Sequence, residues 1–168
     1  MFIGLEDIWA PEGSDRKQRW LNMHAYAARI FGLGLAPFEA FAIWTLTDAV
    51  EGVMIPVRGS PDLVSRDPST IEDLPFKAAA AAAWIKYSGT SLYGRDEPVP
   101  GTDRGPLWRL RKKEAIKPRR KFKGTQGLCL ERWLLWKAQF GEIGRCDSVD
   151  GHIQTLAKET VALMDKIE

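Results

Sequence analysis

Cysteine and histidine are scarce in this chain of 168 residues, which contains two of each. Two cysteines, Cys129 and Cys146, are too few for a disulfide framework, so we expect free thiols in a reducing compartment. Their spacing to His24 and His152 lacks the close ligand pair that makes a structural zinc signal specific, and no H-E-x-x-H motif occurs. We therefore predict no metal site and no cofactor.

The motifs of common catalytic and nucleotide-binding sites are missing too: there is no G-x-S-x-G, no phosphate-binding loop and no dinucleotide fingerprint. Cys146 and His152 lie six residues apart across an expected helix start, which favours a surface thiol and a surface imidazole over a catalytic pair. Asp48 and Glu51 have an i, i+3 spacing, but no second acidic motif faces them. We interpret these two carboxylates as a helix end beside solvent, and the question of enzymatic activity stays open.

No apolar run is long enough for a membrane span, because the longest, residues 40–46 and 78–85, fall well short of about 18 residues. The first residues, MFIGLEDIW, have no basic region, and Glu6 and Asp7 interrupt them before any apolar stretch of signal-peptide length. We expect an intracellular, cytoplasmic protein that binds no membrane. A basic segment described below is also compatible with the nucleus.

Period-two alternation of apolar and polar residues is absent, so we expect no sheet, whereas apolar spacings of three and four predict helices. Residues 20–52 form the centre of this pattern, with one apolar helix from Asp15 to Gly34 and a second from Pro37 to Gly52. So short a connection makes two helices antiparallel. We expect this helical pair in the interior, with the tryptophans of later segments covering it.

Three further helices are expected. One begins at Asp73 and contains six consecutive alanines, whose small side chains permit close helix packing. A second begins near Leu130, with Glu131 and Arg132 on its outer face, and the last follows caps at residues 147–148. The predicted fold is all-α, an antiparallel bundle of about five helices in one domain, residues 1–168. It includes an N-terminal arm, 1–13, and two long loops, 53–72 and 94–127.

Charge is unevenly distributed although the net charge is only +2. Residues 104–123 carry ten Lys or Arg and one acid, so this segment is +9 and the remainder of the chain is −7. Such a segment can attract an anionic partner or fold back on its own acidic body. If it binds nucleic acid, phosphate contacts would come from its basic side chains. These are Arg109, Arg111, Lys112, Lys113, Arg119, Arg120, Lys121 and Lys123.

Arg29 lies in the apolar segment AYAARIFG, where a buried guanidinium would need a partner. We favour a structural ion pair with Asp48 or Glu39 over a ligand-binding arginine. The alternative is a pocket between helices for a small apolar metabolite, in a carrier or a cyclase-like enzyme. Its lining would consist of Trp20, Asn22, His24, Arg29, Trp44, Trp84 and Tyr87.

Four stretches carry a resemblance over roughly residues 20–142: WLNMHAYAARIFGLGLAPFEAFAIWTLTDAVE, AAAAAWIKYSGTSLY, GPLW and LERWLLWK. In the order and spacing of their Trp, Asn and Ala-Ala-Arg residues, they resemble an uncharacterised family of fungal helical proteins classed as a domain of unknown function. The resemblance implies a small helical fold with no established activity, and it assigns no catalytic residue. The chain departs from the family pattern by lacking further N-terminal helices and by a longer basic insert between Trp108 and Leu128.

Three functions are compatible with these observations. We rank first a non-enzymatic helical module that binds a protein partner, or a second copy of itself, through apolar surface left uncovered by the missing helices. Metabolite binding ranks second, and nucleic-acid binding ranks third.

Overall fold

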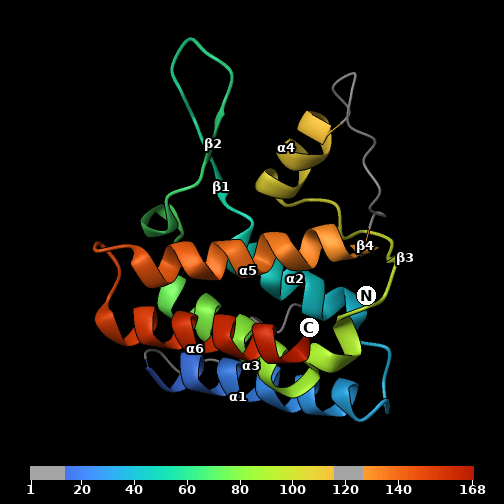
Figure 1. Ribbon diagram of the computed structural model, residues 1–168. Helices are drawn as coiled ribbons and strands as arrows, with labels where there is room; N and C mark the ends of the chain where they lie inside the picture. The colour runs from blue at the N-terminus through green and yellow to red at the C-terminus, as the bar shows by residue number, and fades with distance from the viewer. Residues whose placement is uncertain (1–13, 116–126) are drawn as a thin grey trace.

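Six α-helices build the protein in a computed structural model that describes residues 14–115 and 127–168 (Figure 1). The helices are α1 (Ser14–Gly32), α2 (Glu39–Val50), α3 (Leu74–Leu92), α4 (Pro106–Ala115), α5 (Leu130–Arg145) and α6 (Gly151–Ile167). The prediction of an all-α fold is confirmed. The expected N-terminal arm, 1–13, lies outside the described residues. No helix of the described part is long and apolar enough to cross a membrane.

The turn between α1 and α2 forms where the sequence places it. Gly34 has a φ of 71°, in the left-handed region that glycine adopts without a steric penalty. Its N–H donates to the carbonyl of Phe31 at 2.9 Å, and the N–H of Leu35 donates to the carbonyl of Ile30 at 3.1 Å. This pair of bonds is a Schellman motif, which satisfies carbonyls that the helix end would leave unpaired.

The core lies around α2 and α3, as expected for α2. Seven of the twelve residues of α2 are buried, and Ile43 and Leu46 have no exposed surface. On α3 the alanines Ala78, Ala80, Ala81 and Ala82 are buried, which confirms the close packing predicted for this run. Large rings from later segments, Trp84, Trp136 and Phe140, complete the same core.

α1 is placed differently from the prediction, because it lies at the outside of the bundle rather than in its interior (Figure 1). It packs against α3, and of its described side chains only Ala28 and Phe31 are buried. An amphipathic helix with one stripe toward the core is typical of a surface helix. The physical reason is that α1 packs chiefly on α3, which itself lies between α1 and the helices α2 and α6, so only one side of α1 is covered.

Two small antiparallel sheets stand where loops were predicted: β1 (Val53–Ile55) with β2 (Leu63–Ser65), and β3 (Glu97–Pro98) with β4 (Gly127–Leu128). Strands of two or three residues are too short to show alternation in the sequence. A short 3-10 helix, η1 (Pro68–Thr70), follows β2. The predicted loop 94–127 also contains α4, whose first residue, Pro106, suits the first turn of a helix as well as a loop.

Candidate functional site

A fully buried ion pair joins Glu51, at the end of α2, to Arg132, on α5. Both side chains are 0% exposed. The guanidinium is bidentate: Nε donates to Glu51 Oε1 at 2.7 Å and Nη2 donates to Oε2 at 3.1 Å. Trp136 Nε1 donates to the same Oε1 at 2.7 Å. The expectation of a solvent-exposed helix end at Glu51, and of an outward-facing Arg132, is wrong.

The guanidinium of Arg132 also donates hydrogen bonds to two backbone carbonyls and to a threonine hydroxyl. Nη2 donates to the Thr102 carbonyl at 2.7 Å and to Thr47 Oγ1 at 3.2 Å, and Nη1 donates to the Gly127 carbonyl at 3.3 Å. Gly105 allows the approach of the preceding loop, since a Cβ there would lie 1.6 Å from Glu51 Oε2. The cluster therefore fastens the 94–127 connection to the bundle at residues 102, 105 and 127. Its buried charges are paired, as burial requires.

His24 lies at the centre of a second polar cluster, formed by α1, α2 and α3. Its Nδ1 accepts a hydrogen bond from Trp84 Nε1 at 3.0 Å and lies 3.3 Å from Thr45 Oγ1. The ring of Trp20 stands edge-on to the imidazole, with centroids 4.3 Å apart. Burial lowers the pKa of His24 to about 4. A neutral imidazole that accepts a hydrogen bond at Nδ1 matches this environment.

The other predicted pocket residues lie apart from that cluster. Arg29 is exposed: its Nη2 donates to the Tyr87 hydroxyl at 2.8 Å, and its guanidinium carbon lies 4.3 Å from the centre of that ring. Asn22 is exposed and accepts a bond from the Gln18 amide on its own helix. Trp44 points to a different loop, where its Nε1 donates to the Gly101 carbonyl at 2.9 Å.

The expected buried ion pair of Arg29 is therefore wrong. Asp48 binds Arg104 at 2.9 Å, and Glu39 binds Arg95 at 2.9 Å, so both proposed partners are taken by arginines of the 94–105 loop. The structure brings together Trp20, His24 and Trp84 and separates the other four. Two hollows of the described surface are lined by other residues. The metabolite pocket stays a prediction.

The described half of the basic segment lies against acidic groups of the body. Lys112 pairs with Asp103, and Arg111 lies 3.7 Å from Glu131. Arg109 Nε donates to the Asp103 carbonyl at 2.6 Å, whereas Lys113 is exposed. The other four predicted contacts lie outside the described residues: Arg119, Arg120, Lys121 and Lys123. Nucleic-acid binding stays a prediction, and α4 shows that part of the segment folds back on the protein.

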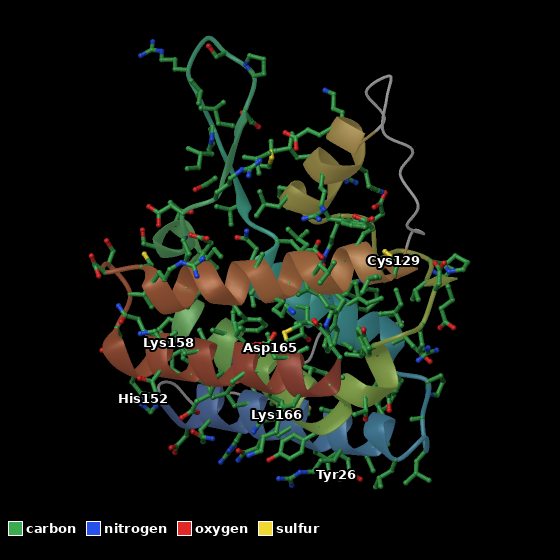
Figure 2. All side chains as sticks on the ribbon, in the orientation of Figure 1. Tyr26, Cys129, His152, Lys158, Asp165 and Lys166 are labelled. Carbon is green, nitrogen blue, oxygen red and sulfur yellow. The ribbon has the colours of Figure 1, made fainter. Side chains whose placement is uncertain are left out.

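Large apolar side chains are exposed on the outer face of α1 and in the turn after it. Tyr26 is 65% exposed, Leu33 72% and Leu35 69%. Residues 26, 30 and 33 follow the i, i+4, i+7 spacing of one helix face. Figure 2 shows Tyr26 at the edge of the molecule, pointing away from the bundle. We call this surface, with Ile30 at its centre, the α1 face.

An open hollow of about 370 Å³ adjoins the α1 face at the α1–α2 turn. Phe31, Leu35 and Pro37 line its apolar part, and Glu39 and Arg95 line its polar part. Arg95 also pairs with Glu97. Burial alone would raise the pKa of Glu39, but the hydrogen bond and charge of Arg95 outweigh it and hold that pKa below its usual value.

Residues 5–140 match the model of a family described as protein of unknown function (DUF3632). The chain belongs to this family. No curated protein and no solved structure matches it. The predicted membership of a family of unknown function is confirmed for DUF3632, while a fungal source stays a prediction.

The segments that carried the family resemblance converge in this DUF3632 protein. The end of the first stretch supplies Glu51, GPLW supplies Gly105 and Trp108, and LERWLLWK supplies Arg132 and Trp136. The guanidinium carbon of Arg132 lies 5.2 Å from the ring centre of Trp108 and 5.7 Å from that of Trp136. The carboxylate and guanidinium have no exposed surface for a ligand, so we interpret the cluster as structural.

Sequence reasoning missed the Glu51–Arg132 pair, although one signal for it exists. Arg132 and Trp136 have i, i+4 spacing, so the arginine shares a face with a tryptophan. A cation on an aromatic face of a helix is a candidate for burial with a carboxylate partner. The identity of that partner, 81 positions away in the chain, could come only from the fold.

Proposed function

We propose that this DUF3632 protein is a non-enzymatic interaction module that binds a partner protein through the α1 face. The exposure of Tyr26, Leu33 and Leu35 supports the proposal most directly. Single exposed apolar residues are ordinary, but a group of large ones along one side of a helix and the turn after it, beside a hollow, is typical of a binding surface. Burying them against a partner would gain about 25 cal/mol for each Å² of apolar area removed from water.

Charge selects the kind of partner. α1 carries the bases Arg16, Lys17, Arg19 and Arg29 and the acid Asp15, so its formal charge is +3. Two copies of α1 packed on each other would bring like charges together, which disfavours self-association through this face. An acidic amphipathic helix fits better, with its apolar stripe on the α1 face and its carboxylates near the basic side chains.

The hollow at the α1–α2 turn would accept an anchoring side chain of that helix. Interfaces gain most of their affinity from a few large side chains inserted into pockets, with polar groups at the rim. Phe31, Leu35 and Pro37 offer the apolar contact, and Arg95 and Glu39 stand at the edge. Leu33 and Leu35 would flank the inserted group.

Site-specific photo-cross-linking in an extract of the source cells tests this function. A photoreactive phenylalanine analogue is placed at position 26 or 33, with position 152 as the control, because His152 is also exposed but lies on α6. We expect one protein to be captured from positions 26 and 33 and not from position 152. That protein, produced in pure form, must then bind the unmodified chain and contain an acidic amphipathic helix. Equal capture at all three positions, or a purified candidate that does not bind, would contradict the proposal.

A further inference from the structure

The β1–β2 hairpin forms a second surface, on the opposite side of the molecule from α1 (Figure 1). Within the described residues its sheet has two strands, paired Val53 with Ser65, Met54 with Val64 and Ile55 with Leu63. Each strand therefore has one edge without a strand neighbour in the described part. Such an edge presents unpaired N–H and C=O groups and can pair with another strand.

One face of the hairpin is fixed to the body. Val64 packs against the small cluster of Leu107, Trp108, Cys129 and Leu135, so the strand is held in its extended form before any partner binds. The opposite face carries the cross-strand neighbours Ile55 and Leu63, which are 38% and 62% exposed. A pre-ordered strand costs less conformational entropy on pairing than a flexible one.

The sequence of the β2 edge is complementary to itself. Residues 62–66 read Asp-Leu-Val-Ser-Arg, with a proline on one side at Pro61 and another two residues beyond at Pro68. If two copies pair antiparallel about Val64, Asp62 of each copy stands opposite Arg66 of the other. Both side chains are exposed and carry opposite charges, and directly opposed charges of unlike sign stabilise a strand pair.

The β1 edge lacks this property. Pairing two copies about Met54 would place Pro56 opposite Gly52, and a proline supplies no N–H to the ladder. That register also brings no opposite charges together. Charge and backbone chemistry both favour β2, rather than β1, as the edge at which two copies would pair.

We propose that the protein forms a homodimer by antiparallel pairing of β2 with β2 of a second copy, which gives a four-stranded sheet in the order β1-β2-β2-β1. The two-fold axis passes beside Val64, and two Asp62–Arg66 ion pairs close the ends of the new ladder. Such a contact is isologous, so it closes on itself and stops at two copies. It is separate from the α1 face and leaves that face open in both copies.

Charge reversal tests the register directly, with the full chain followed by analytical ultracentrifugation up to about 1 mM. Asp62→Arg or Arg66→Asp alone turns both ion pairs into like-charge contacts, and we expect each to weaken dimerisation by about tenfold or more. An equimolar mixture of the two single variants should restore it, because a mixed dimer regains two opposite-charge pairs. This rescue cannot result from misfolding of either variant.

Two controls separate the proposed dimer from other effects. Arg66 also lies 3.9 Å from Glu114 on α4, so Glu114→Gln removes that contact but must leave the dimer unchanged. Leu33→Asp alters the α1 face and must leave the dimer unchanged too, which separates failure of this proposal from failure of the proposed partner binding. A wild-type chain that stays monomeric, single variants that dimerise as the wild type does, or a mixture without rescue would each overturn the proposal.

Discussion

Around Glu51, charged groups lie in the interior and are paired, whereas along α1 large apolar side chains lie in water. The first region obeys the rule that a buried charge needs a partner and hydrogen bonds to its remaining donors. Along α1, large apolar side chains stay exposed to water in the folded chain, where a partner could bury them. The comparison teaches that the conspicuous polar cluster serves stability, and that the surface without conspicuous chemistry is the better candidate for function.

The largest expected loss of stability comes from disrupting the buried Glu51–Arg132 ion pair. Glu51→Gln removes the charge that compensates Arg132 and leaves a guanidinium buried without a counter-ion, so the free energy of unfolding should fall by about 3–5 kcal/mol. Urea unfolding followed by circular dichroism measures it. The matched control is Asp48→Asn on the same helix, whose exposed pair with Arg104 should matter by less than about 1 kcal/mol. Similar losses of unfolding free energy in the two variants would contradict the claim that the buried pair stabilises the fold more than the exposed pair does.

A change of intermediate size in the free energy of unfolding is expected from protonation of His24 at low pH. Its pKa is about 4 in the folded protein and about 6.5 in a free imidazole, so the unfolded chain binds the proton more readily. The stabilising contribution is complete above about pH 6.5 and is lost as pH falls toward 4, by up to about 3 kcal/mol.

Urea unfolding at a series of pH values, with His24→Gln beside the wild type, checks this prediction. The difference between the two stability profiles should shrink as pH falls between those two pKa values. His152→Gln, which changes an exposed imidazole, should follow the wild type. A difference between His24→Gln and wild type that does not change with pH would show that His24 binds its proton equally well in the folded and unfolded chains, and would contradict the prediction.

The all-α class, the short α1–α2 turn and the buried position of α2 could be predicted from the sequence, because periodicity and the Gly34 and Pro37 signals are local. The outside position of α1 could not, since an apolar helix does not reveal how many neighbours cover it. Glu51 and Asp48 share one helix end, yet one is buried and one exposed. Glu51 is buried because the loop that contains Gly105 and the helix that contains Arg132 cover it, and neither contact can be predicted from the local sequence.

The smallest effect is expected outside the core. An ion pair links the starts of α1 and α3, with Lys17 Nζ 2.9 Å from Asp73 Oδ1, but the two side chains are 46% and 52% exposed. Lys17→Ala should lower the free energy of unfolding by about 0–1 kcal/mol, and the difference should shrink in high salt because exposed pairs are screened. A loss comparable with that of Glu51→Gln would mean that α1 is more tightly integrated than its exposure indicates.

The central claim, that the α1 face binds a partner protein, is tested most directly by calorimetric titration of the cross-linked partner into two matched variants. Leu33→Asp and Leu130→Asp each replace an exposed leucine at the end of a helix: Leu33 directly follows α1 and is 72% exposed, and Leu130 begins α5 and is 55% exposed. The account predicts that Leu33→Asp weakens binding by about tenfold or more, equivalent to at least about 1.4 kcal/mol, while Leu130→Asp binds as the wild type does and both keep wild-type stability. Equal affinity of the Leu33→Asp variant and the wild type would contradict it.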